Sequence, residues 1–112
     1  FQNGEQILLN GQFSITPIKV PHRDELSDMH AFLIGGASKR LLFLPDHDSW
    51  QQTLEFHRQP DILSWLNYLQ VDFALLDGTF WSEEELGGRS QENVPHPPVK
   101  QTLQMLGERK NV

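Results

Sequence analysis

Short apolar runs that end at Gly, Pro or Asp most constrain the fold of this chain. Residues 31–34, 41–44 and 71–76 are such runs, and the residues that break them are Gly35, Pro45 and Asp77. Runs of this length suit strands and are too short for ordinary core helices. The first two runs do not alternate cleanly between apolar and polar residues. We therefore expect them in a sheet that is covered on both faces.

The first twenty residues predict a β-hairpin. Residues 7–9 form an apolar run, and Asn10 with Gly11 would supply the two positive-φ positions of a type I′ turn. A second strand begins at Phe13. Pro17 interrupts its alternation, so this strand is expected at a sheet edge or with a bulge.

Two helices are expected in the second half of the chain. Asp61 is a plausible N-cap for a helix over residues 62–69, which carries one broad apolar face. The final helix opens at residues 97–98 and places three apolar residues on one stripe, Val99, Leu103 and Leu106. Residues 47–60 show no clear pattern, and 78–95 are expected to form a loop. The predicted order is β-β-β-β-α-β-α, which is typical of an α/β fold.

Composition limits the function classes. The 112 residues allow a single domain over 1–112, and 9 Lys+Arg against 15 Asp+Glu give a net charge of −6, which argues against nucleic-acid binding. The absence of cysteine excludes disulfides, cysteinyl zinc sites and thiol catalysis. No apolar stretch approaches the roughly 18 residues needed to span a membrane. No charged-then-apolar leader appears at the start of the sequence, and we expect a cytoplasmic protein. Because the sequence opens on Phe1 rather than a methionine, we also expect it to be a piece of a longer protein.

Imidazole and carboxylate side chains gather where predicted strands end or the last helix begins. They are His22 and Asp24, then Asp46, His47 and Asp48, then Asp77, and finally His96. Sites in α/β sheets form beyond the carboxyl ends of strands, and these side chains are suitable ligands for a divalent metal.

Each of these residues also has a purely structural interpretation. His22 would then be a loop histidine, residues 46–48 a turn, and His96 an exposed neighbour of the helix N-terminus. The acidic run 83–85 is expected to be a solvated face. We expect structural roles for the two remaining histidines, His30 and His57.

Several segments in order carry a family resemblance: 20–28, 31–34, 42–50, 71–81 and 95–97. Together they resemble the C-terminal half of a metallo-β-lactamase-fold protein, and within that superfamily the coenzyme PQQ (pyrroloquinoline quinone) synthesis protein B and its relatives. The similarity covers about residues 15–106. It implies part of an αββα architecture, with one mixed β-sheet and helices on one face.

The resemblance also implies roles for five residues. His22 falls at a metal-binding histidine and Asp46 at the aspartate that bridges two metal ions of Zn, Mn or Fe type. His96 falls at a catalytic histidine that contacts substrate or transfers a proton, while Asp77 and Trp81 would line the mouth of the substrate-binding cleft. Two bridged cations would activate a shared water for hydrolysis.

The family's His-x-His-x-Asp-His motif and its terminal metal histidine are absent from these residues. We therefore expect a truncated metal-dependent hydrolase-like or PQQ-biosynthesis-related protein that binds metal weakly, or not at all, and lacks autonomous activity. Its substrate would be a small molecule, and its partner the missing N-terminal half. The alternative is a non-catalytic interaction domain that homodimerises over an open sheet face.

Overall fold

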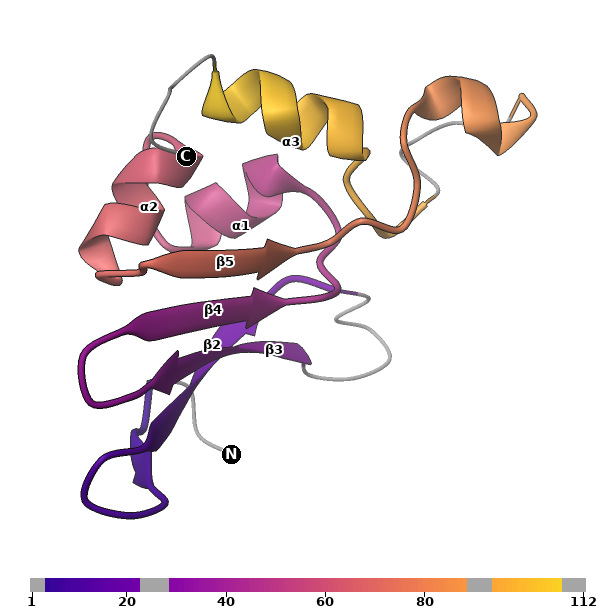
Figure 1. Cartoon of the computed structure of the whole chain (residues 1–112). Coiled ribbons are helices and arrows are strands. Elements are labelled where there is room, and N and C mark those ends of the chain that lie inside the picture. The colour runs from indigo at the N-terminus through magenta and orange to yellow at the C-terminus, as the bar shows by residue number, and fades with distance from the viewer. Residues whose placement is uncertain (1–3, 23–28, 89–93, 108–112) are drawn as a thin grey trace.

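A computed structural model describes residues 4–22, 29–88 and 94–107 of the chain. These residues form a five-stranded sheet with three α-helices packed on one of its faces (Figure 1). The strands are β1 Ile7–Leu8, β2 Ser14–Val20, β3 Met29–Gly35, β4 Arg40–Leu44 and β5 Phe73–Leu76. The helices are α1 Trp50–Phe56, α2 Ile62–Tyr68, the short 3₁₀ helix η1 Glu83–Leu86 and α3 Val99–Leu106.

The order of strands in the sheet is the order in the sequence. β1 to β4 are antiparallel neighbours, whereas β5 joins β4 in parallel after a crossover through α1 and α2. The predicted α/β class and mixed sheet are therefore confirmed. Because β2, β4 and β5 run in the same direction, their C-terminal ends all lie at one edge of the sheet.

The core lies between the sheet and the helices. Alternate residues of β2, β3 and β4 point into it and meet the apolar sides of the three helices. Trp50 of α1 and Trp65 of α2 are fully buried, with ring centroids 6.2 Å apart in an edge-to-face arrangement. The buried apolar residues are Ile18, Val20, Ala31, Leu33, Leu42, Leu44, Trp50, Leu54, Ile62, Trp65, Leu69 and Leu106.

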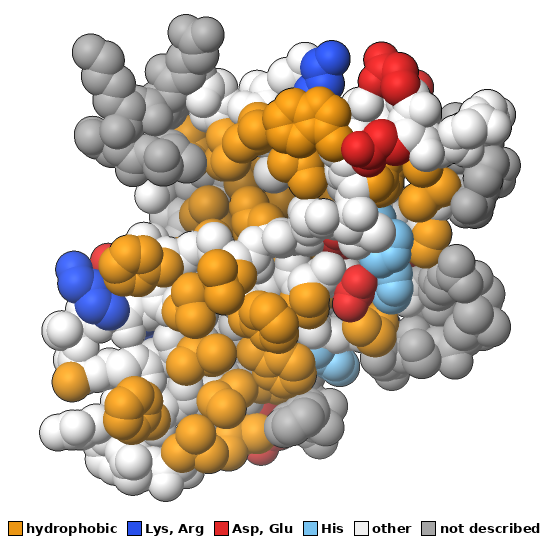
Figure 2. All heavy atoms as spheres, turned by 45° about the vertical axis from the view of Figure 1, so that its right-hand side comes forward, with side chains coloured by type: hydrophobic (Ala, Val, Ile, Leu, Met, Phe, Trp, Pro, Cys, Tyr) orange, Lys and Arg blue, Asp and Glu red, His pale blue; other side chains and the backbone are white. Residues whose placement is uncertain are grey.

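The opposite face of the sheet, here called the open face, is apolar, and the described residues leave much of it uncovered. Phe73 and Leu75 are 61% and 56% exposed, and they pair in register with Leu41 and Phe43 of β4. The prediction of a sheet covered on both faces is thus wrong for the described chain. Figure 2 shows hydrophobic side chains gathered side by side across the molecule. The apolar residues that the register places on the open face are Ile15, Phe32, Ile34, Leu41, Phe43, Phe73 and Leu75.

The N-terminal hairpin forms, but not through the predicted turn. Neither Asn10 nor Gly11 has a positive φ, so the type I′ turn is wrong. The Asn10 carboxamide instead accepts hydrogen bonds from the backbone N–H groups of Gln12 and Phe13, at 2.8 and 3.0 Å. β1 pairs only with Ser14 and Ile15 of β2. β2 lies between β1 and β3, so the predicted edge position is wrong, but Pro17 lies where β1 no longer pairs and its missing N–H is tolerated there.

The sequence predicted α2 but not α1. The Asp61 carboxylate accepts a hydrogen bond from Ser64 N at 2.7 Å and caps α2 as expected. α1 forms where no pattern was evident, with Ser49 as its N-cap. Its buried residues, Trp50, Thr53 and Leu54, are the usual spacing of one helix face. A threonine among them conceals this face in the sequence.

α3 has the predicted start but a different buried face. Leu103 is 52% exposed, whereas Thr102 is buried, so the predicted apolar stripe is wrong by one residue. The reason is a polar contact, because the Trp50 indole N–H donates a hydrogen bond to the Thr102 hydroxyl at 2.7 Å. Among the described residues, no helix has the length and hydropathy needed to cross a membrane.

Replacing the α2 cap tests this account of the fold. Asp61→Ala removes the acceptor for Ser64 N, and we expect the free energy of unfolding to fall by about 1 kcal/mol in urea denaturation. Asp61→Ser retains a capping oxygen and should stay close to wild type. Equal stability of the two variants would contradict the capping role.

Candidate metal centre

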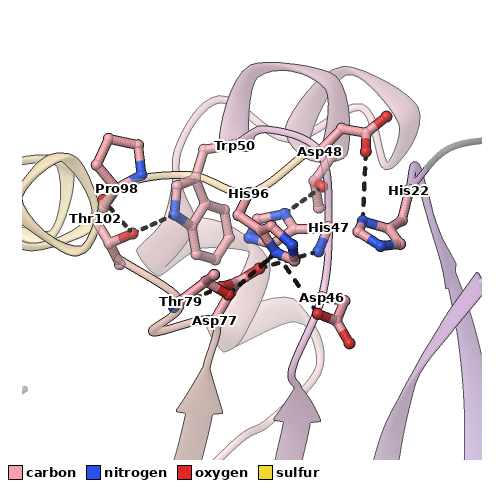
Figure 3. A network of polar contacts seen from close by, with 11 residues as sticks. His22, Asp46, His47, Asp48, Trp50, Asp77, Thr79, His96, Pro98 and Thr102 are labelled. Atoms are coloured by element: carbon pink, nitrogen blue, oxygen red, sulfur yellow. Dashed lines mark hydrogen bonds and ion pairs between the residues drawn. The ribbon is translucent and has the colours of Figure 1, made fainter. Parts of the chain in front are cut away.

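Three strand ends and one loop bring polar side chains together at one edge of the sheet (Figure 3). His22 follows β2, Asp46 follows β4 and Asp77 follows β5. His96 comes from the proline-rich segment that leads into α3. The segments are adjacent because β2, β4 and β5 run in the same direction.

His22, Asp46 and His96 form what we call the edge cluster. Each offers one nitrogen or oxygen atom, and the three atoms lie within 4.8 Å of one another. The two imidazole rings have centroids 5.2 Å apart. All three side chains are partly buried, and the Asp46 side chain is the most accessible at 39% exposed. These are the residues that the resemblance assigns to metal binding and catalysis.

The donor atoms of the edge cluster suit a divalent cation. His22 Nδ1 is buried and makes no hydrogen bond with the described residues, although Asp48 Oδ1 lies 3.4 Å away. A buried ring nitrogen that makes no hydrogen bond is costly unless another group or an ion binds it. Nitrogen and carboxylate oxygen donors of this kind fit Zn, Mn and Fe.

Asp77 lies beneath His96 and is fully buried, its side chain having no exposed surface. One carboxylate oxygen, Oδ2, lies 2.8 Å from His96 Nδ1 and accepts a hydrogen bond from His47 N at 3.3 Å. The other, Oδ1, accepts from the backbone N–H and the hydroxyl of Thr79. We expected Asp77 to line the mouth of a substrate-binding cleft. The structure differs, because the carboxylate faces His96 and not solvent.

His96 lies between two carboxylates, with Nδ1 also 3.6 Å from Asp46 Oδ1. Because a carboxylate accepts hydrogen bonds, the short contact with Asp77 assigns the proton to Nδ1. The other ring nitrogen, Nε2, then carries a lone pair. His96 Nε2 is therefore able to bind a cation or to accept a proton.

His47 was predicted among the polar residues at the end of β4, but not as a buried side chain. It is fully buried, its Nδ1 lies 2.7 Å from the Thr53 hydroxyl, and its ring meets Trp50 edge-on at 4.5 Å. Burial lowers its pKa to about 4; the Asp77 carboxylate raises it in part, and His22 and His96 lower it further. The imidazole is therefore neutral at pH 7. His47 stands between Asp46 and Asp48, and such polar neighbours do not indicate a buried side chain.

The remaining predicted residues lie elsewhere. Trp81 is exposed, and its backbone contacts Glu85 and Lys100 rather than the edge cluster. Its substrate-binding role stays a prediction. Asp24 lies outside the described residues. His57 has the structural role that we expected, since it stacks on Trp65 and its Nε2 lies 2.8 Å from the Lys19 carbonyl oxygen.

Comparisons with protein-family models, with curated proteins and with solved structures found no match for this chain. The metallo-β-lactamase relationship therefore remains a prediction from the sequence. The geometry of the edge cluster is an independent observation.

The lowered pKa of His47 predicts a loss of stability in mild acid. Below pH 6.5 an unfolded chain protonates this histidine, whereas the folded chain resists until about pH 4. The contribution of the neutral His47 imidazole to the free energy of unfolding is present above pH 6.5 and is lost as the pH falls toward 4. At pH 5 the metal-free protein should lose about 2 kcal/mol from this group in urea denaturation.

His47→Gln should remove that part of the pH dependence. His57 is half-buried and its pKa is also lowered by burial, so His57→Gln is the matched comparison. His57→Gln should change the pH dependence of the unfolding free energy in the same direction as His47→Gln, but by a smaller amount. A His47→Gln variant with the full wild-type loss between pH 7 and pH 5 would contradict the buried neutral imidazole.

Proposed function

We propose that the edge cluster holds a divalent cation and that the chain works in a metal-dependent hydrolase of the metallo-β-lactamase type. The observation that carries this proposal is the convergence of His22, Asp46 and His96, which come from three distant segments, within 4.8 Å. When bound, Zn, Mn or Fe would lower the pKa of a coordinated water and polarise a substrate oxygen.

The chain's own residues prepare this site. Asp77 holds His96 through Nδ1, which orients the ring and leaves one nitrogen for the cation or for a proton. The accessible Asp46 carboxylate is positioned to meet ligands from solvent. His22 contributes a buried nitrogen that lacks a hydrogen bond to the described residues.

The proposed architecture is one half of an αββα sandwich. A mixed sheet with helices on one face and an apolar open face fits one sheet layer and its helical cover. The substrate would be a small molecule, in hydrolysis or in PQQ biosynthesis. Because the His-x-His-x-Asp-His ligands are absent from the sequence, we expect little or no turnover by this chain alone.

Metal analysis tests the proposal. The sequence alone predicts weak metal binding or none, whereas three converging donors favour one bound ion. After dialysis against Zn²⁺, Mn²⁺ or Fe²⁺, the purified protein should therefore retain about one equivalent of one of these metals per chain. His22→Ala and Asp46→Asn each remove a donor and should lower the affinity for that metal at least about 10-fold. Isothermal titration calorimetry and elemental analysis provide the two measurements.

His30→Ala is the matched control, because His30 lies on β3 and does not belong to the edge cluster. It should bind metal like the wild type. Less than about a tenth of an equivalent in the wild-type protein would overturn the proposal. Equal losses of metal affinity in His30→Ala and in the edge-cluster variants would also overturn the proposal.

A second function rests on the open face. Large apolar side chains are exposed on adjacent strands there, and a soluble monomer seldom leaves such a surface in contact with water. A second copy of the chain offers the same apolar surface, and isologous packing of the two sheets would bury it on both. The chain would then act as an interaction domain that homodimerises.

Light scattering at micromolar concentration tests this second function. The wild type should be a dimer, and Leu75→Lys should make it a monomer, because the substitution places a charge within the exposed apolar surface of the open face. Tyr68→Lys is the matched control, since Tyr68 is exposed on α2 on the helical side of the sheet. A wild-type monomer, or the same dimer in both variants, would contradict homodimerisation.

A further inference from the structure

We infer that the hydrogen bond between Trp50 and Thr102 positions His96 against Asp77. Neither Trp50 nor Thr102 belongs to the edge cluster, and both are buried in the core. The positioning of His96 does not depend on the proposed function. Only its purpose, metal binding, rests on that function.

The first part of the connection runs from α1 to the start of α3. Trp50 Nε1 donates to the Thr102 hydroxyl at 2.7 Å, and that hydroxyl donates to the Pro98 carbonyl oxygen at 3.4 Å. A buried indole N–H needs an acceptor, and Thr102 supplies it. The contact therefore sets the rotation of α3, whose buried face is shifted to include Thr102.

The second part runs from α3 to the imidazole. Pro98 is two residues from His96, and Pro97 between them is fully buried. Each proline ring restricts φ, so the segment has little freedom to absorb a displacement of the helix. The position of α3 is therefore transmitted to His96.

The third part returns from Trp50 to the same carboxylate oxygen. The Trp50 ring packs edge-on against His47 at 4.5 Å, and His47 N donates to Asp77 Oδ2. This oxygen is the one that lies 2.8 Å from His96 Nδ1 (Figure 3). Trp50 is thus linked indirectly to both members of the pair, to Asp77 through His47 and to His96 through Thr102 and the start of α3.

Two backbone hydrogen bonds hold α3 independently of these side chains. Val99 N donates to Phe80 O at 2.9 Å, and Lys100 N donates to Trp81 O at 3.0 Å. Loss of the Thr102 hydroxyl should therefore turn α3 without releasing it. The expected consequence is a displaced His96 in a folded protein.

The experiment compares Thr102→Val with Thr102→Ser. Valine keeps the shape and removes the hydroxyl, whereas serine keeps the hydroxyl. In the metal-free protein at one neutral pH, nitrogen-edited NMR should detect a protected His96 Nδ1–H in the wild type and in Thr102→Ser. In Thr102→Val its exchange with solvent should be at least about 10-fold faster, and Zn²⁺ affinity should fall by about 10-fold.

Leu106→Ala is the matched control, because Leu106 is buried on the same helix but has no polar contact with Trp50. It lowers stability without removing the hydroxyl, so the His96 signal should persist. An unchanged signal in Thr102→Val, its loss in Leu106→Ala, or its absence in Thr102→Ser would overturn the inference.

Trp50→Phe removes the donor from the other side and is measured if Thr102→Val does not fold. Failure of both variants to fold would also overturn the inference, since the bond would then maintain the whole core. The NMR signal needs no metal. A wild-type protein that binds no Zn²⁺ would therefore refute the proposed function and leave the positioning role of Trp50 and Thr102 to be decided separately.

Discussion

The arrangement of the sheet edge depends on one buried carboxylate. Asp77 receives contacts from the end of β4 through His47 N, from its own turn through Thr79, and from the segment before α3 through His96. A carboxyl group without exposed surface is tolerated only when its oxygens are paired in this way. Because the donors come from three separate segments, satisfying the carboxylate requires those segments to meet at one point. The position of His96 next to Asp46 is a consequence of that requirement.

The sheet makes this meeting possible. Three antiparallel connections carry the chain from β1 to β4, so β2 and β4 point the same way, and the α1–α2 crossover returns β5 in the same direction. The crossover helices also supply Trp50 and Trp65, the two largest buried side chains. Trp50 therefore serves two purposes, since it fills the core beneath the sheet and donates its N–H to Thr102 of α3. Packing of the core and geometry of the site share a residue.

The sequence predicted what local chemistry determines. Asp61 predicted the start of α2, the prolines predicted the start of α3, and the apolar runs predicted the strands of an α/β sheet. Polar residues at strand ends and before the last helix predicted a cluster at this edge, and the resemblance selected His22, Asp46 and His96 from it. Most of what failed depended on contacts between distant residues, whereas the hairpin turn depended on a local side-chain contact. The rotation of α3 is set by Trp50, the hairpin turn by the Asn10 side chain, and the burial of His47 by the helices around it. Periodicity in a single segment contains none of this information.

The edge cluster and the open face are structurally connected, which bears on both proposed functions. Phe43 lies on the open face three residues before Asp46, and Leu75 lies there two residues before Asp77. A protein surface that covers these two side chains would end close to the edge cluster. Three protein ligands are few for the proposed dinuclear centre, and the Asp46 carboxylate is accessible to further ligands. Covering the open face and completing the metal centre are therefore compatible tasks for one partner, and metal affinity should increase with occupancy of the open face if the same surface supplies the additional ligands.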